Sequence, residues 1–253
     1  MKNKVPHVVL AFWVIKIAAT TLGETGGDYL SMTLNLGYAL STAVFFALFL
    51  ITLLAQVAAK SFQPFLYWAV ILTTTTTGTT ISDYLDRTAG LGYLRGDLLL
   101  VTVLAATLGL WRLSTGSVAV DRITTRKAEV FYWMTILVSN TLGTALGDFL
   151  ADSSGLGYQG GALLIGVVLA GVAALYRFTA VSRTLLFWTA FVLTRPLGAT
   201  LGDLLTKSHA KGGLDLGTLA SSAVLATFLV IAIALTSKRS EDDAHTSGPG
   251  QAA

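Results

Sequence analysis

The sequence predicts an all-α integral membrane protein with eight transmembrane helices. Three observations carry this prediction: the composition, a series of long apolar runs and a fourfold internal repeat. Of the 253 residues, 53% are hydrophobic and only 12% are charged, whereas an average soluble domain has about 25% charged residues. Each apolar run approaches the roughly 20 residues that an α-helix needs to cross about 30 Å of hydrocarbon.

The eight runs are separated by short polar breaks that leave no room for a soluble domain. They begin near Val8, Gly37, Phe65, Leu91, Phe131, Gly157, Leu185 and Leu216. We therefore expect one transmembrane domain over residues 1–237 and a disordered tail over the polar segment 238–253. The first run could pass for a signal peptide, but its repetition later in the chain argues against cleavage.

Basic residues concentrate in alternate breaks, which predicts the orientation. One side carries eleven of them: Lys2, Lys4, Lys60, Arg112, Arg122, Arg126, Lys127, Arg177, Arg183, Lys238 and Arg239. The other side carries four: Arg87, Arg95, Lys207 and Lys211. The positive-inside rule then places both termini in the cytoplasm, as an even number of spans also requires. This distribution explains the net charge of +3, so we expect the lipid bilayer and not nucleic acid as the partner.

A fourfold repeat organises the whole chain. Four segments align without gaps: "FWVIKIAATTLGETGGDYL", "YWAVILTTTTTGTTISDYL", "YWMTILVSNTLGTALGDFL" and "FWTAFVLTRPLGATLGDLL". Each begins with an aromatic residue and a tryptophan (Trp13, Trp68, Trp133, Trp188), and an aspartate follows fifteen residues after each tryptophan (Asp28, Asp83, Asp148, Asp203). The first two copies map onto the last two with a constant offset of 120, which indicates two duplicated halves.

A second helix follows in each copy and opens with "LNLGYALS", "AGLGYLRG", "SGLGYQGG" or "LDLGTLAS". Each repeat is thus predicted to be a helical hairpin, over about residues 7–60, 62–115, 127–179 and 182–237. Because a repeat contains two spans, all four copies enter the membrane in the same direction, as parallel repeats do. The four first helices can then surround a common centre.

These tryptophan and Gly-Asp patterns resemble a family of bacterial membrane proteins built from four tandem repeats, each with two transmembrane segments and a characteristic tryptophan. The resemblance covers about residues 7 to 237 and implies the topology above in a bacterial inner membrane. That family is described as of unknown function, so the resemblance implies no residue role. Repeat four departs from the pattern at Pro196 and at the insertion "KSHAKGG".

Small residues precede each aspartate by five positions and by one position. They are Gly23 and Gly27, Gly78 and Ser82, Gly143 and Gly147, and Gly198 and Gly202. Small side chains at this spacing share one helix face and allow two backbones to approach closely in lipid. We expect these positions to mediate helix packing.

The repeated aspartates are candidate ion-binding residues. A charged side chain at the bilayer centre costs roughly 2.5–3.5 kcal/mol, so such residues usually serve a function or have a partner. The alternative is that they cap helix ends or pair with a neighbouring helix. Glu24, one turn before Asp28, adds a second acid to repeat one, where the other repeats have Thr79, Thr144 and Ala199. Together with these acids, Thr79, Thr144 and Asn140 are candidate ion-binding residues.

A second polar layer is expected nearer the middle of the membrane. It contains Thr20, Thr75, Asn140 and Arg195, and the run "TTTTTGTT" at residues 73–80 passes through it. The threonines either bond carbonyls of the preceding turn or line a polar path. Arg195 is expected to be an internal counter-ion for Asp203 or another acid, with snorkelling as the alternative, and Lys16 is open to either role.

The four tryptophans are predicted to be interfacial anchors, and a cation-binding cage is the alternative. The chain has no cysteine and no P-loop, HExxH or GxSxG motif, so we expect neither an enzyme nor a cofactor. No metal ligand set and no oligomeric state is predicted.

The charges within the spans predict the function. Five acids (Glu24, Asp28, Asp83, Asp148, Asp203) face two bases (Lys16, Arg195), an excess of three negative charges. Protons or bound cations would balance this excess. We therefore expect a cation transporter, either proton-coupled or specific for a hard divalent ion such as Mn²⁺ or Mg²⁺, or for an organic cation. The alternatives are a cation channel with a ring of aspartates and a non-transporting scaffold or sensor subunit.

Overall fold

The structure, a computed structural model, describes residues 4–6 and 8–246. In this part of the chain it contains eight long α-helices, which confirms the all-α prediction. The helices are α1 (Leu10–Asp28), α2 (Gly37–Ala58), α3 (Pro64–Asp83), α4 (Tyr93–Thr115), α5 (Arg126–Asp148), α6 (Gly157–Phe178), α7 (Arg183–Thr206) and α8 (Thr218–Thr246). Five-residue π-helical segments follow α1, α3 and α5, namely η1 (Tyr29–Thr33), η2 (Tyr84–Thr88) and η4 (Phe149–Ser153). Two short 3₁₀ helices, η3 (Val120–Arg122) and η5 (His209–Lys211), lie in connections.

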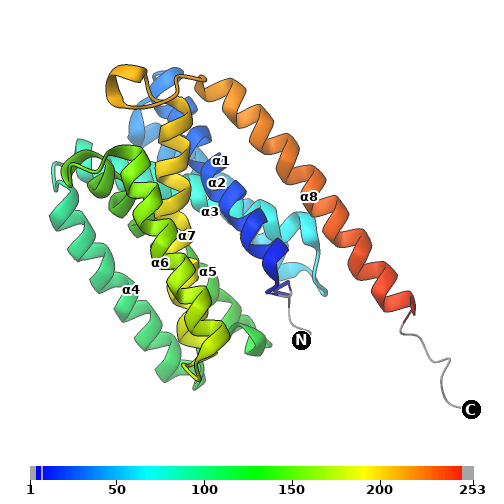
Figure 1. The fold of residues 1–253 in the computed structure, drawn as a ribbon. Coiled ribbons are helices and arrows are strands. Elements are labelled where there is room, and N and C mark those ends of the chain that lie inside the picture. Colours follow the sequence, from blue (N-terminus) through cyan, green and yellow to red (C-terminus); the bar gives the residue numbers. More distant parts are fainter. Residues whose placement is uncertain (1–3, 7, 247–253) are drawn as a thin grey trace, which may run out of the picture.

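The helices form an inner and an outer shell. The odd-numbered helices α1, α3, α5 and α7 pack in sequence, and α7 also packs against α1, so these four inner helices make a closed ring. The even-numbered helices lie outside this ring, with α4 and α8 on opposite flanks of the bundle (Figure 1). The start of α1 and the end of α8 lie at the same end of the molecule (Figure 1).

Each outer helix packs against the inner helix of the next repeat. Thus α2 packs on α3, α4 on α5, α6 on α7, and α8 closes the cycle on α1. The two helices of one repeat have few direct contacts, so the predicted hairpin within each repeat is not what the structure contains. The connection after each inner helix leads the chain away to the neighbouring repeat before the outer helix begins.

A glycine in the left-handed region makes this change of direction at the equivalent place in every repeat. The φ angles are 74° at Gly37, 70° at Gly92, 64° at Gly157 and 78° at Gly217. Side chains with a Cβ are strained in this region, whereas glycine adopts it readily. The positive φ angle therefore explains why a glycine follows the leucine at the start of each second helix.

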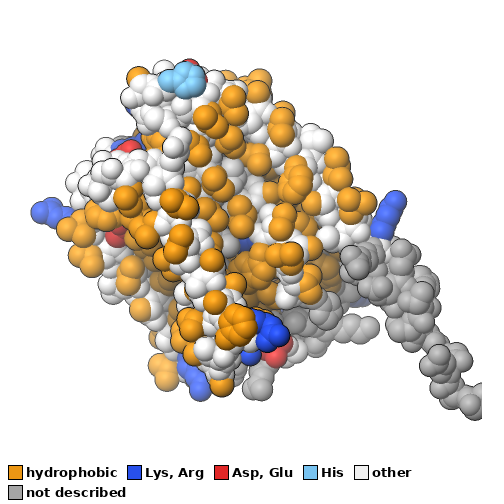
Figure 2. Space-filling model, viewed as in Figure 1, with side chains coloured by type: hydrophobic (Ala, Val, Ile, Leu, Met, Phe, Trp, Pro, Cys, Tyr) orange, Lys and Arg blue, Asp and Glu red, His pale blue; other side chains and the backbone are white. Residues whose placement is uncertain are grey.

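The outward surface of the bundle is apolar. Among the described residues, five helices are long and apolar enough to cross a membrane: α2, α4, α6, α7 and residues Thr218–Lys238 of α8. Hydrophobic side chains cover much of the face shown in Figure 2. The outer helices expose large residues such as Leu54, Leu163 and Val224. A surface of this kind is typical of a protein that lies in lipid.

Helices α1, α3 and α5 are more polar than the five helices above, and their threonine, asparagine and charged side chains are buried in the bundle. Because the outer helices cover them, these polar side chains do not face the outward surface.

The last helix, α8, continues to Thr246. It thus extends into the segment 238–253, for which the sequence predicted a disordered tail, and residues 247–253 lie outside the described part.

Candidate functional site: a polar axis between the inner helices

Side chains at equivalent positions of the four inner helices are buried between these helices, in layers to which each helix contributes one residue. We call the side chains three, seven, eleven and fifteen residues after each repeated tryptophan the polar axis. Its successive layers are Lys16, Ile71, Ile136 and Phe191; Thr20, Thr75, Asn140 and Arg195; Glu24, Thr79, Thr144 and Ala199; and Asp28, Asp83, Asp148 and Asp203. None of these side chains is more than 4% exposed. Successive layers are four residues apart, and a helix rises about 6 Å over four residues, so the layers are separated by about 6 Å.

A ring of aromatic side chains closes one end of the axis, where the inner helices begin. The aromatic residue before each tryptophan contacts the tryptophan of the next repeat, with ring centroids 5.5 to 6.2 Å apart. The contacts are Phe12–Trp68, Tyr67–Trp133, Tyr132–Trp188 and Phe187–Trp13. The hydroxyls of Tyr67 and Tyr132 share a hydrogen bond of 2.7 Å. Like the helices, the aromatic contacts form a closed cycle.

This ring corrects the prediction that the tryptophans are interfacial anchors. Trp68, Trp133 and Trp188 are at most 6% exposed, and Trp13 is partly buried. Trp68, Trp133 and Trp188 thus stack inside the bundle on helix faces that turn toward neighbouring repeats, whereas Trp13 also lines an outer groove.

Arg195 is the central cation of the polar axis. Its Nη2 lies within hydrogen-bond distance of Glu24 Oε2 at 2.8 Å, Thr79 Oγ1 at 2.5 Å and Thr144 Oγ1 at 2.6 Å, so its two N–H groups are shared among three acceptors. Helical side chains tilt toward the helix N-terminus, which brings the Glu24 carboxylate down toward the level of Arg195. Arg195 is thus an internal counter-ion, for Glu24 and not for Asp203. Arg195 comes from α7, and its three partners come from α1, α3 and α5. Side chains from all four inner helices therefore meet at its guanidinium group.

Lys16 lies one layer below, in apolar surroundings. Its side chain is 0% exposed, and its ammonium lies 4.2 Å from the centroid of the Phe191 ring. Among the described residues, Lys16 Nζ has neither a hydrogen-bond partner nor a carboxylate partner. Neither snorkelling nor charge pairing, the two roles considered from sequence, describes its position.

Two cations bridge the four aspartates at the other end of the axis. Arg87 contacts Asp83 at 3.2 Å and Asp148 at 2.9 Å. Lys207 contacts Asp28 at 2.5 Å and Asp203 at 3.1 Å. From the sequence both cations are expected in polar breaks on the side opposite the termini, and these pairs are not predicted. The signal that could have found them is their spacing, since each follows an aspartate by four residues on the same helical face.

These pairs change the charge balance that the sequence suggested. Adding Arg87 and Lys207 leaves five acids against four bases, so the excess of three negative charges falls to one. Burial lowers the pKa of Lys207, but Asp28 and Asp203 raise this pKa more, so it lies above the ordinary value. Lys207 therefore stays charged throughout the physiological pH range.

The buried carboxylates include one compact cluster. Glu24, Asp28 and Asp203 each offer an oxygen, and these oxygens lie within 4.8 Å of one another. Carboxylate oxygens suit hard cations such as Mg²⁺, Mn²⁺ or Ca²⁺. Glu24 and Asp28 are one turn apart on α1, whereas Asp203 comes from α7. The closing contact between the first and last repeats is what assembles this group.

The remaining predicted polar residues divide between the axis and local bonding. Asn140 Nδ2 donates to Thr74 Oγ1 at 3.1 Å, between α5 and α3. Thr79 reaches Glu24 and Arg195. In contrast, Thr73, Thr74, Thr76, Thr77 and Thr80 bond carbonyls of their own preceding turn. Most of the threonine run thus satisfies itself along α3.

The repeated small residues lie where inner helices meet. A Cβ added to the first glycine of each repeat would fall 3 Å or less from the next inner helix. The nearest atoms are Thr75 Cγ2 at 1.9 Å for Gly23, Thr141 N at 2.9 Å for Gly78, Arg195 Cγ at 2.4 Å for Gly143 and Thr20 Oγ1 at 2.2 Å for Gly198. The second set behaves similarly: Gly27 approaches Thr79, Gly147 approaches Ala199, Gly202 approaches Glu24, and Ser82 is buried.

Comparison with known proteins supports the division into repeats. A family model described as a repeat of unknown function, DUF347, matches residues 11–62, 66–117, 131–182 and 186–241. The chain belongs to the DUF347 family. No curated protein and no solved structure matches it.

The DUF347 repeats are not equivalent at the aspartate layer. Arg87 in the second repeat and Lys207 in the fourth are related by the offset of 120 residues between the two halves. The first and third repeats have Met32 and Asp152 at this position. Each cation bridges its own repeat to the next, so the ion pairs follow the duplicated halves and not the fourfold repeat.

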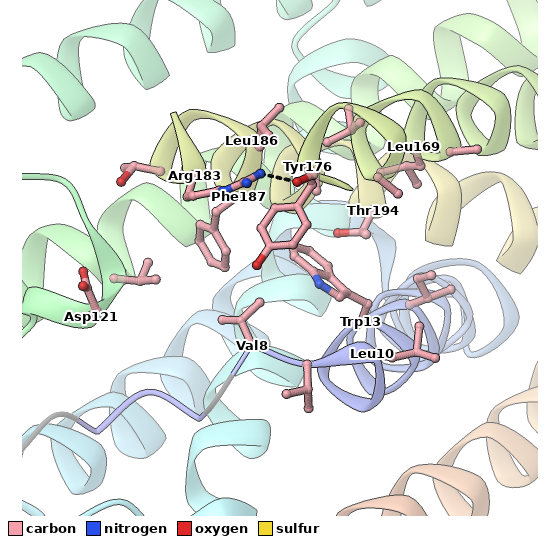
Figure 3. Close-up of a pocket in the computed structure, with 18 residues that line it drawn as sticks. Val8, Leu10, Trp13, Asp121, Leu169, Tyr176, Arg183, Leu186, Phe187 and Thr194 are labelled. Atoms are coloured by element: carbon pink, nitrogen blue, oxygen red, sulfur yellow. Dashed lines mark hydrogen bonds between the residues drawn. The ribbon is translucent and has the colours of Figure 1, made fainter. Parts of the chain in front are cut away.

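A separate groove outside the polar axis is apolar. It has a volume of about 730 Å³ and lies between α1, α6 and α7 (Figure 3). Its lining includes Trp13, Leu169 and Phe187, and its charged members are Asp121 and Arg183. Arg183 donates a hydrogen bond to the carbonyl of Tyr176. Its lining holds a single carboxylate, that of Asp121, whereas the cluster of Glu24, Asp28 and Asp203 offers three to a small cation.

Proposed function

We propose that this DUF347 protein is an integral membrane protein with eight spans, located in a bacterial cytoplasmic membrane with both termini in the cytoplasm. The apolar outer shell supports this placement. The three more polar helices α1, α3 and α5 would cross the membrane inside that shell, shielded from lipid. The excess of basic residues at the end where α1 begins supports the orientation.

We further propose that it transports a small cation, and the buried cluster of Glu24, Asp28 and Asp203 carries this proposal. Three carboxylates whose oxygens lie within 4.8 Å of one another in a protein interior repel one another unless protons, basic residues or a bound cation compensate them. Lys207 and Arg195 compensate part of this charge. A cation that enters would replace Lys207 at Asp28 and Asp203, and its departure would restore the ion pairs.

Closure at both ends favours a carrier over a channel. The aromatic ring blocks the axis at one end, and the Arg87 and Lys207 pairs cover it at the other. A channel needs a continuous path in its open state, whereas a carrier opens one end at a time. Protonation of the carboxylates would provide a means of coupling to a proton gradient.

Flux through reconstituted protein tests the proposal. Purified protein in liposomes is exposed to Mn²⁺, Mg²⁺ or an organic cation, with and without a proton gradient. We expect selective uptake by the wild type and at least a tenfold loss in Asp28→Asn. The matched control is Asp152→Asn, which removes an exposed carboxylate near the same end of the bundle and should retain uptake. Absence of uptake of every cation by the folded wild type would refute transport.

The four ion pairs that Arg87 and Lys207 make with the aspartates favour one alternative, a non-transporting membrane scaffold in which the aspartates hold repeats together. On this alternative Asp28→Asn would lower thermal stability because it leaves Lys207 with a single partner, and the wild type would move no cation. Unchanged stability of Asp28→Asn together with lost uptake would exclude the scaffold.

A further inference from the structure

Each inner helix contributes one buried polar side chain that has an unsatisfied atom at the middle of the polar axis. The residues are Lys16 on α1, Thr75 on α3, Asn140 on α5 and Arg195 on α7, and all four are 0% exposed. The atoms without a hydrogen-bond partner among the described residues are Lys16 Nζ, Thr75 Oγ1, Asn140 Oδ1, and Arg195 Nε and Nη1. Their residues belong to two adjacent layers above the aromatic ring, and the guanidinium group of Arg195 extends toward Thr79 and Thr144 in the next layer.

Such a concentration of unsatisfied groups is unusual. Most buried polar atoms in proteins have a partner, and a buried charge without one is costly. Thr75, Asn140 and Arg195 occupy the same layer, and Lys16 lies one turn below on the helix that packs against α7. A common ligand between the four helices would satisfy groups that the chain itself leaves unpaired.

The charges indicate what this ligand is. Two basic side chains lie here, and their hydrogen-bonded acid is Glu24, which occupies only Nη2 of Arg195. The free atoms are mainly donors: three N–H groups of Lys16, the N–H groups at two nitrogens of Arg195, and the hydroxyl of Thr75. Donors with excess positive charge suit an anion, and a water molecule bound beside it can donate to Asn140 Oδ1.

We propose that Lys16, Thr75, Asn140 and Arg195 form an internal binding site for a small inorganic anion of the size of chloride. The four residues lie between the aromatic ring on one side and the Arg195–Glu24 pair on the other, so we expect the site to accept a small anion in preference to a large organic one. It lies deeper than the carboxylate cluster of Glu24, Asp28 and Asp203. The proposal does not depend on cation transport, since the unpaired groups are present whatever crosses the membrane.

Thermal unfolding of the purified full chain in detergent tests the site. The midpoint Tm is measured in sodium chloride and in sodium gluconate at equal ionic strength, because gluconate is too large to enter. A ligand that binds only the folded state raises Tm in a saturable way. We expect chloride to raise the wild-type Tm by about 2–4 °C or more, and bromide to act similarly.

Two lysine variants make the test specific. Lys16→Met removes the buried cation and should abolish the chloride response. It should also be at least as stable as the wild type in gluconate, because an unpaired buried charge has been replaced by an apolar group. Lys60→Met removes an exposed lysine and should keep the full response. Equal Tm values of the wild type in the two salts, or an unchanged chloride response in Lys16→Met, would overturn the proposal.

A direct measurement covers the case in which Lys16→Met does not fold. Binding of radioactive chloride to the wild type is measured by scintillation proximity, with unlabelled bromide and gluconate as competitors. We expect stoichiometric binding that bromide displaces and gluconate does not. Absence of saturable binding to the folded wild type would show that water alone fills the site.

Discussion

Substitution of Gly78 by alanine tests the close approach of the inner helices. A Cβ at this position would lie 2.9 Å from Thr141 N and 3.0 Å from Asn140 C, both backbone atoms of α5. A backbone cannot move aside as a flexible side chain can, so α3 and α5 must separate. Overpacking of this kind costs about 1–3 kcal/mol, which exceeds the roughly 0.5–1 kcal/mol that alanine gains over glycine inside a helix.

Gly171→Ala is the matched control. Gly171 lies within α6 on the exposed surface, and an added Cβ there meets no atom within 4 Å. This variant should be more stable than the wild type by about 0.4–1 kcal/mol, because only the helix preference of alanine acts.

The two variants should therefore shift Tm in opposite directions. Tm is followed by intrinsic tryptophan fluorescence in detergent, and the monodisperse fraction is checked by size-exclusion chromatography. A central overpacking cost of about 2 kcal/mol, offset by the helix preference of alanine, leaves a net loss of about 1 kcal/mol. For a chain of this size this corresponds to a decrease in Tm of about 2–4 °C for Gly78→Ala. If Gly78→Ala were as stable as Gly171→Ala, the inner helices would not be in contact at this position, and the closed ring would be refuted.

Two further pairs of buried groups give double-mutant tests. Tyr67→Phe leaves the hydroxyl of Tyr132 unpaired and should destabilise the protein by about 1–3 kcal/mol, while the double variant with Tyr132→Phe should recover much of this loss; additive losses in chemical denaturation would contradict the hydrogen bond. Lys4 Nζ contacts Glu129 at 2.9 Å, and both side chains are 3% exposed. Lys4→Met should cost about 3–5 kcal/mol by leaving the carboxylate unpaired, and Lys4→Met with Glu129→Gln should be more stable than Lys4→Met alone.

The repeat pattern predicted much of the polar axis. The fixed interval between tryptophan and aspartate implied that equivalent residues share a depth in the bundle, and the structure places them in common layers. The small residues before each aspartate pointed to close helix contacts, and they lie at the contacts between inner helices. The spacing also suggested that Arg195 is an internal counter-ion. Its actual partner, Glu24, belongs to a different repeat and could not be chosen from the sequence.

Other features depended on how the repeats pack together. The tryptophans occupy positions typical of interfacial anchors, yet the ring turns their helix faces inward and buries Trp68, Trp133 and Trp188. Arg87 and Lys207 stand in polar breaks, and their spacing after Asp83 and Asp203 was a weak signal. Each becomes a bridge only because the aspartate of the next repeat lies beside it.

The sequence by itself determined the helices, the fourfold repeat and the depth of each polar residue. These follow from local rules, because apolar runs form helices and a helix rises by a constant amount per residue. Only the tertiary structure decided which helix faces which. The exchange of outer helices between repeats, the closure of α7 on α1 and the grouping of Glu24, Asp28 and Asp203 all arise from contacts between distant segments. Their geometry depends on helix rotation and packing, which spacing along the chain does not specify.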